Sequence, residues 1–296
     1  MDKQGHLNMR FMLLLLALVL IHPAKGDTHY HAHSSLDEQI TLLAQGEEFQ
    51  TVYHPHMAPA HRGTIIFFAS LMDPVGGKHG FAYLRYALSE KGYDSYLVLN
   101  NISIAAASED IVQTPDDTAA SDSATQTQSA PSEPQTPTEQ QSYIPNYQSA
   151  YALIDLDTYK SRLQAQLESV MQRAAQTPKP VSIFAIGQGA GLLSEYLSEF
   201  PEIELQAMIA LNSYLPDPER NRHIGANFSI IIPAVLDLYT TSAHSMTDSH
   251  KKLGPLWAQK NQKLDYRQVE LLDDANNSEQ LARLTTEIDG FLRRLF

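Results

Sequence analysis

The sequence of 296 residues contains no cysteine. Disulfide bonds, a lipid-modified N-terminal cysteine and thiolate metal sites are therefore excluded. Basic residues are scarce as well: 21 Lys and Arg stand against 34 Asp and Glu, which gives a formal net charge of −13 at pH 7. Because so acidic a chain repels nucleic acid phosphates and anionic lipid, we expect no nucleic acid partner.

Long apolar runs are also missing, apart from Phe11–Ile21, which follows the basic residues Lys3 and Arg10. That run is too short to span a bilayer but fits the core of a secretory signal peptide. Ala24–Gly26 supplies small residues for a cleavage site. We therefore expect residues 1–26 to be removed, no membrane span afterwards, and a periplasmic or otherwise exported protein. An uncleaved membrane anchor is the alternative.

Residues 36–296 alternate short apolar runs with segments of helical periodicity. This alternation predicts a single domain of the α/β class, built on a doubly wound and mostly parallel sheet. The expected strands are 49–53, 63–70, 95–99, 181–186, 205–211, 230–240 and 266–272. The expected helices are 36–45, 81–91, 156–174, 192–200, 253–262 and 281–296, with a polar helix or loop at 217–222.

Two segments lack the composition of a packed core. Residues 105–147 are rich in Ala, Ser, Thr, Gln and Pro, and they carry acids but no Lys or Arg. We interpret this segment as a disordered insertion within the domain, because such a composition buries too little apolar surface to offset its ordering entropy. A lid that closes over a ligand is the alternative. Residues 27–35 are expected to form a His-rich mobile tail.

A glycine-rich turn follows the strand at 181–186. Gly187–Gly191 reads G-Q-G-A-G and leads straight into a predicted helix. Strand, sharp turn and helix are the setting of the nucleophile elbow, on which a serine is exposed in serine hydrolases. The middle position of this turn is Gly189, so the elbow is present but its nucleophile is missing.

The chain resembles the α/β-hydrolases, and more narrowly a family of exported proteins of Gram-negative bacteria with a hydrolase-like sheet. The motifs that carry this resemblance are Arg62–Phe67, Leu84–Leu88, Gly187–Gly191, Pro233–Tyr239 and Tyr266–Val269, in that order. The resemblance spans roughly residues 36–296. It implies a fold and an exported location but no particular reaction, since a fold alone does not assign function.

The other two triad positions of such an enzyme also hold unsuitable residues. The acid position after the strand at 230–240 falls at Ser242, and the histidine position after the last strand falls at Asn276 and Asn277. Ser70 and Ser194 are alternative nucleophiles, but neither has a histidine at a familiar spacing. The pattern favours a protein without serine-hydrolase activity.

The elbow is nevertheless a candidate binding site. Backbone amides at a helix N-terminus attract a carboxylate or phosphate, which makes Gln188, Gly189 and Ala190 ligand-binding candidates, together with Ser70 near the expected oxyanion region. The alternative is that the glycines serve only turn geometry and close packing.

Asp237 lies inside an apolar strand, where a charge needs a partner. Arg267 on the next strand is the candidate. The alternative is that Asp237 lies near the end of its strand and is hydrated.

Histidine is concentrated at the start of the exported chain, where His29, His31 and His33 form a compositional metal signal. Cleavage before Asp27 would also create an N-terminus able to chelate Cu(II) or Ni(II) through His29. The alternative is a solvated tail that holds no metal.

Together these patterns predict an exported, non-catalytic α/β-hydrolase-like protein that binds a small ligand or an envelope protein. A hydrolase with an unrecognised nucleophile and a periplasmic metal-handling protein are the two alternatives.

Overall fold

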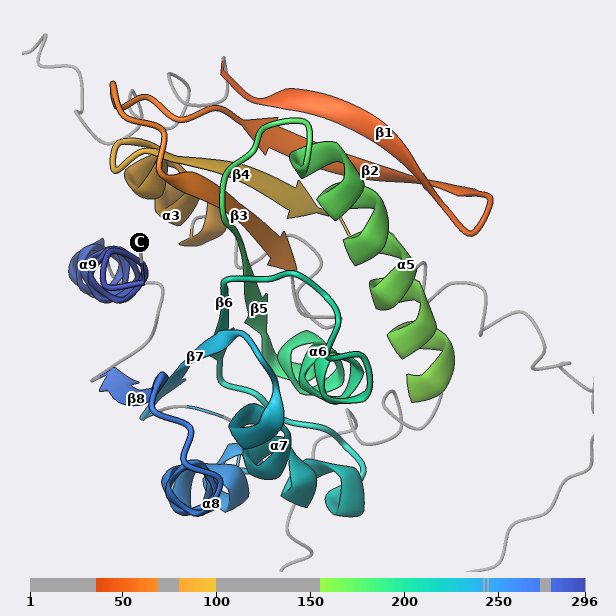
Figure 1. Cartoon of the computed structure of the whole chain (residues 1–296), viewed down its shortest axis with the longest axis vertical. Helices are drawn as coiled ribbons and strands as arrows, with labels where there is room; N and C mark the ends of the chain where they lie inside the picture. The colour runs from red at the N-terminus through yellow and green to blue at the C-terminus, as the bar shows by residue number, and fades with distance from the viewer. Residues whose placement is uncertain are drawn as a thin grey trace, which may run out of the picture.

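The structure, a computed structural model, describes residues 36–68, 80–99, 155–241, 243, 245–271 and 278–295. Its strands form one eight-stranded sheet in the order β1-β2-β4-β3-β5-β6-β7-β8 (Figure 1). The strands are β1 (Glu38–Ala44), β2 (Glu47–His54), β3 (Gly63–Phe68), β4 (Tyr93–Val98), β5 (Val181–Ile186), β6 (Ala207–Leu211), β7 (Ala234–Thr240) and β8 (Tyr266–Leu271). The helices are α3 (Gly80–Ser89), α5 (Leu156–Ala174), α6 (Gly187–Glu199), α7 (Pro218–Ile230), α8 (Thr247–Lys260) and α9 (Ser278–Leu292).

The sheet is parallel from β4 to β8, and only β1 and β2 pair antiparallel with their neighbours. Every residue of β3, β4 and β6 is buried, as strands covered on both faces should be. The prediction of a doubly wound, mostly parallel sheet is therefore confirmed.

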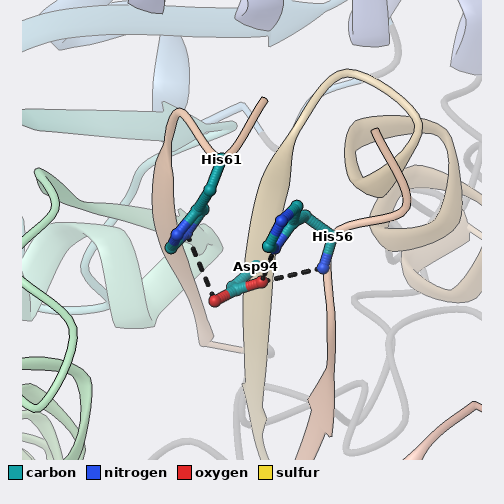
Figure 2. A group of neighbouring side chains, drawn as sticks. All are labelled: His56, His61 and Asp94. Carbon is teal, nitrogen blue, oxygen red and sulfur yellow. Dashed lines mark hydrogen bonds and ion pairs between the residues drawn. The ribbon is translucent and has the colours of Figure 1, made fainter. Parts of the chain in front are cut away.

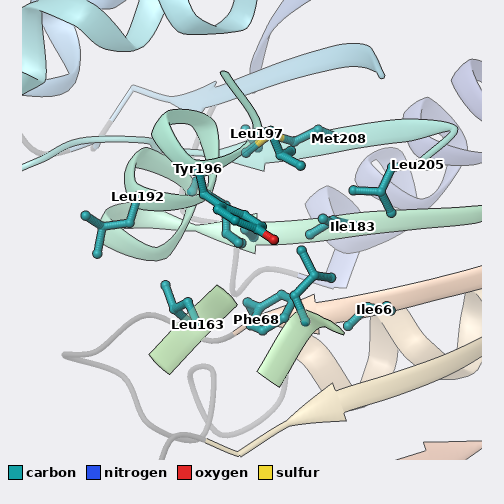
Figure 3. Close-up of a cluster of buried hydrophobic side chains, with 14 of the residues drawn as sticks. Ile66, Phe68, Leu163, Ile183, Leu192, Tyr196, Leu197, Leu205 and Met208 are labelled. Atoms are coloured by element: carbon teal, nitrogen blue, oxygen red, sulfur yellow. The ribbon is translucent and has the colours of Figure 1, made fainter. Parts of the chain in front are cut away.

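Two hydrophobic clusters cover the two faces of the sheet. Alternate strand residues such as Phe68 and Ile183 pack against α5 and α6, as Figure 3 shows. Their neighbours Phe67 and Phe184 point to the opposite face, where α3 and α9 pack. Helices α5 to α8 thus lie on one side of the sheet, and α3 and α9 lie on the other (Figure 1).

The predicted helix at 36–45 is wrong, because most of this segment is strand β1. Gln45 and Gly46 have φ of 52° and 86°, and they form a two-residue turn between β1 and β2. Two successive positive φ angles match the twist of an antiparallel hairpin. Ile40 and Leu42 then pack against the core with a period of two, not with helical spacing.

The strand predicted at 230–240 begins later in the structure than predicted. Ile230 ends α7, and β7 starts at Ala234. Helix α7 begins after Asp217, whose side chain accepts hydrogen bonds from the backbone N–H of Glu219 and Arg220.

None of the helices in the described part of the chain is long and apolar enough to cross a membrane. The expected signal peptide, the His-rich tail at 27–35 and the insertion at 105–147 lie outside the described residues.

Candidate functional site

The elbow is a sharp turn between β5 and α6. Strand β5 ends at Ile186, helix α6 begins at Gly187, and Gly187 has a φ of 58°. In serine hydrolases the nucleophile occupies the strained turn residue itself. The nucleophile position is therefore Gly187, and the prediction of Gly189 is two residues too late. Both residues are glycine, so the elbow carries no hydroxyl.

Gly191 of the elbow serves close packing. A Cβ atom at Gly191 would lie 2.8 Å from both Leu215 Cγ and the carbonyl oxygen of Tyr214. The backbone N–H of Tyr214 donates to the carbonyl oxygen of Gly187 at 3.3 Å. The segment after β6 thus packs directly on the elbow, which supports the packing alternative for Gly191.

Gln188 follows the turn and is fully buried, yet its side chain lacks partners. Neither its amide oxygen nor its amide nitrogen makes a hydrogen bond within the described part of the chain. The Oγ atom of Ser213, just after β6, is likewise buried without a partner there. Because an unpaired buried polar group costs about 1–3 kcal/mol, these atoms are suited to receive a ligand or an ordered water.

Asn212 fixes the carboxyl edge of the sheet next to the elbow. It adopts a φ of 50° at the end of β6, donates from Nδ2 to Thr240 Oγ1 at 3.0 Å, and accepts from the Thr240 N–H at 2.8 Å. These bonds hold the ends of β6 and β7 together. Asn212 and Ser213 are not among the residues predicted from the sequence; the signal that could have found them is a pair of polar residues directly after an apolar strand.

Of the remaining serine, asparagine and histidine candidates, Ser194 is described by the structure and the rest are not. Ser194 is buried and donates from Oγ to the carbonyl oxygen of Gly191 at 2.7 Å, so its hydroxyl is occupied within its own helix. The candidates outside the described residues are Ser70, Ser242, Asn276, Asn277, His29, His31 and His33.

The predicted pair of Asp237 and Arg267 is wrong. The register of β7 and β8 sets Asp237 opposite Gln268, so the side chain of Arg267 points to the other face of the sheet. There Arg267 Nη2 forms an ion pair with Glu287 Oε2 at 2.8 Å. Asp237 is fully buried and accepts hydrogen bonds at 2.9 Å from both the Tyr266 hydroxyl and Gln268 Nε2. The alternative of a hydrated Asp237 is therefore wrong too.

His250 of α8 lies above the same carboxylate. Its Nε2 atom is 3.8 Å from Asp237 Oδ1, and both side chains are fully buried. The ring also meets Phe228 edge to face. Burial and the neighbouring charge of Asp237 raise the pKa of Tyr266 far above its usual value. This cluster lies between the sheet and α8 rather than at the carboxyl edge, so we assign it to stability.

The sheet order, its helix layers and the elbow define an α/β-hydrolase fold. Residues 25–294 match a family described as "Protein of unknown function (DUF3530)", and the chain belongs to that family. None of the curated proteins matches the chain in sequence.

Solved structures of hydrolases are similar in fold. The putative dienelactone hydrolase from Klebsiella pneumoniae superposes with a TM-score of 0.56 at 13% identity, covering 87% of this chain and 98% of that one. The esterase domain of a Rhodothermus marinus protein gives 0.54 at 10% identity, with 87% and 98% covered. The dienelactone hydrolase from Anabaena variabilis gives 0.53 at 10% identity, with 87% and 97% covered. At such low identity the similarity establishes the fold alone.

Proposed function

We propose that this protein binds an acyl compound, an ester or a carboxylate, at the carboxyl edge of its sheet beside Gly187. The observation that supports this most is the elbow itself: its turn residue, Gly187, has a positive φ and no side chain, and it is the first residue of α6. Backbone N–H groups at a helix start can donate to a carboxylate or carbonyl oxygen. The buried amide of Gln188, which has no partner among the described residues, adds polar atoms to the same turn.

Hydrolysis is the second candidate, and the comparisons fit it better than they fit a protein without catalysis. The similar structures are named as esterases and dienelactone hydrolases. In this chain the elbow cannot supply the nucleophile, because Gly187 has no hydroxyl. A hydrolase would therefore take its nucleophile from another segment, such as Ser70, or from an activated water.

We also propose that the protein is exported, on the basis of the apolar run at 11–21 and the small residues at 24–26. N-terminal sequencing of the protein from its host should find Asp27 first. Any other start would contradict the cleavage site, and it would also remove the chelate that His29 is expected to form with Cu(II) or Ni(II).

We predict that the protein purified from Asp27 onward will not turn over short-chain nitrophenyl esters or react with a fluorophosphonate probe. A working serine hydrolase that loses its nucleophile loses about 10⁶-fold in kcat. Gly187→Ser should also fail to produce turnover, because a serine without a base to accept its proton stays a weak nucleophile. Stoichiometric labelling of any serine, located by peptide mass spectrometry, would instead establish the hydrolase candidate.

Ligand retention tests the binding proposal separately. Native mass spectrometry of the purified protein should show a bound acyl compound, and Gly187→Ala should reduce its occupancy by placing a methyl group on the turn. Gly290→Ala is the matched control, since a Cβ at that position of α9 meets no atom within 4 Å. Equal occupancy in both variants would contradict binding at the elbow.

A further inference from the structure

Two histidines and an aspartate meet at the edge of the sheet opposite the elbow. His56 and His61 belong to the segment between β2 and β3, and Asp94 is the second residue of β4. Their imidazole nitrogens face the two oxygens of the Asp94 carboxylate, as Figure 2 shows. His56 Nδ1 lies 2.8 Å from Asp94 Oδ1, and His61 Nε2 lies 3.2 Å from Asp94 Oδ2.

The carboxylate of Asp94 is held firmly in this position. The side chain is 9% exposed, and the backbone N–H of His56 donates to Oδ1 at 2.7 Å. The two imidazole rings stack at a centroid distance of 4.4 Å with an interplanar angle of 7°. Within the described ranges, the ion-pair partners of Asp94 are these two histidines, and no lysine or arginine joins them.

We propose that His56, His61 and Asp94 together bind one divalent first-row transition metal ion, with zinc as the probe. One ligand atom from each residue lies within 4.8 Å of the others. Zinc bonds of about 2.0–2.2 Å require ligand atoms to approach within about 4 Å of one another. Metal binding therefore requires the two imidazoles to rotate, with His61 Nε2 leaving the Gly63 carbonyl oxygen that now lies 3.1 Å from it. Two imidazoles disfavour Ca²⁺ and Mg²⁺, which prefer oxygen ligands.

The ion binds the segment between β2 and β3 to the core of the sheet. In the parallel pair of β3 and β4, Gly63 lies opposite Tyr93, so the site stands at the start of both strands. The elbow follows the end of β5, which is the other edge of the sheet. The metal therefore stabilises a loop and takes no part in chemistry at Gly187, and this proposal is independent of the proposed function.

The test must exclude zinc binding by the tail, because His29, His31 and His33 are themselves expected to bind metal. The exported chain from Asp27 onward, with these three histidines replaced by alanine, should still bind one zinc per chain in calorimetric titration with ZnCl₂. At a hundredfold excess of free zinc over Kd, the melting temperature should rise by roughly 5–10 °C. Absence of zinc binding by this protein would overturn the proposal.

Single variants locate the site. In the same background, His61→Ala and Asp94→Asn should each weaken zinc binding by more than about tenfold, because the first removes a ligand and the second replaces the anionic oxygen by a neutral one. His223→Ala is the matched control: His223 is exposed on α7, far along the chain, and its loss should leave the affinity unchanged. Unchanged affinity in His61→Ala would overturn the assignment.

A second measurement does not depend on the folding of any variant. Zinc K-edge absorption of the tail-substituted protein should show two imidazole nitrogens together with oxygen ligands. A coordination sphere with one imidazole or none would refute the proposed site.

Discussion

Replacing Asp237 by alanine is expected to lower the free energy of unfolding by roughly 3 kcal/mol. The buried carboxylate accepts from the Tyr266 hydroxyl and from Gln268 Nε2, both at 2.9 Å. Alanine removes the acceptor that both donors share. Gln268 Nε2 still donates to the Tyr266 hydroxyl at 3.2 Å, but each bond lost to the carboxylate costs about 1–3 kcal/mol. Urea denaturation at pH 7, followed by circular dichroism, measures the change.

Asp237→Asn is the matched control, because an amide keeps the shape of the side chain and one oxygen that accepts hydrogen bonds. We expect it to cost less than half as much as Asp237→Ala. An asparagine variant as unstable as the alanine variant would contradict this explanation. It would indicate instead that the negative charge of Asp237, which lies 3.8 Å from His250 Nε2, is itself needed for stability.

The sequence predicted the sheet well, because parallel strands covered on both faces read as continuous apolar runs. Strands β3, β5 and β6 could be recognised in that way. The prediction failed at β1, which lies at the edge of the sheet and is half exposed. There the spacing of Leu36, Ile40 and Leu43 suits a helix. The turn at Gln45 and Gly46 instead makes the segment a strand paired with β2 in a hairpin.

The elbow was recognisable, but its turn residue was not. The run A-I-G-Q-G-A-G at 185–191 allows two alignments with the hydrolase motif. One is centred on Gly189, and the other is centred on Gly187 with Ala185 in place of the first glycine; the backbone φ of 58° at Gly187 distinguishes them. The Asp237 pairing failed because a shift of one residue in register moves a side chain to the other face. His56 and His61 meet Asp94 through strand pairing, which no local pattern predicts.

Replacing Arg85 by methionine is expected to lower the free energy of unfolding by about 3 kcal/mol. Arg85 lies on α3 with 4% exposure, and its guanidinium reaches across to the strands. Nη2 donates to Asp37 Oδ1 at 3.0 Å and to the Val52 carbonyl oxygen at 3.1 Å, while Nε donates to Ser95 Oγ at 3.1 Å. Methionine fills much of the volume but leaves Asp37 without its cation.

The expected loss lies at the lower end of the range for a broken buried pair, about 3–5 kcal/mol. The Asp37 side chain is 29% exposed, so water can replace part of the lost interaction. His54 Nδ1 also remains 2.9 Å from Asp37 Oδ1. Arg85→Lys should recover only part of the loss, since an ammonium group cannot present the planar set of donors that contacts Asp37, Val52 and Ser95.

The cluster of Asp37, His54 and Arg85 should make the free energy of unfolding depend on pH. Burial raises the pKa of Asp37, but the hydrogen bond with His54 and the charges of Arg85 and His54 outweigh it, so the pKa lies below its usual value. A carboxyl group whose pKa is lower in the folded state stabilises the fold above its unfolded pKa of about 3.9, and this contribution disappears as pH falls through the folded value. Asp37→Asn should therefore be less stable than the wild type at pH 7, and the difference should shrink below about pH 4.

Unfolding free energies measured in urea between pH 3 and pH 7 test this, with Glu202→Gln as the control. Glu202 is an exposed carboxylate in the turn after α6, so its removal should leave the pH profile unchanged. A difference between Asp37→Asn and the wild type that stays constant across this range would contradict the lowered pKa of Asp37, because a carboxyl group that titrates alike in the folded and unfolded states adds no pH dependence to stability.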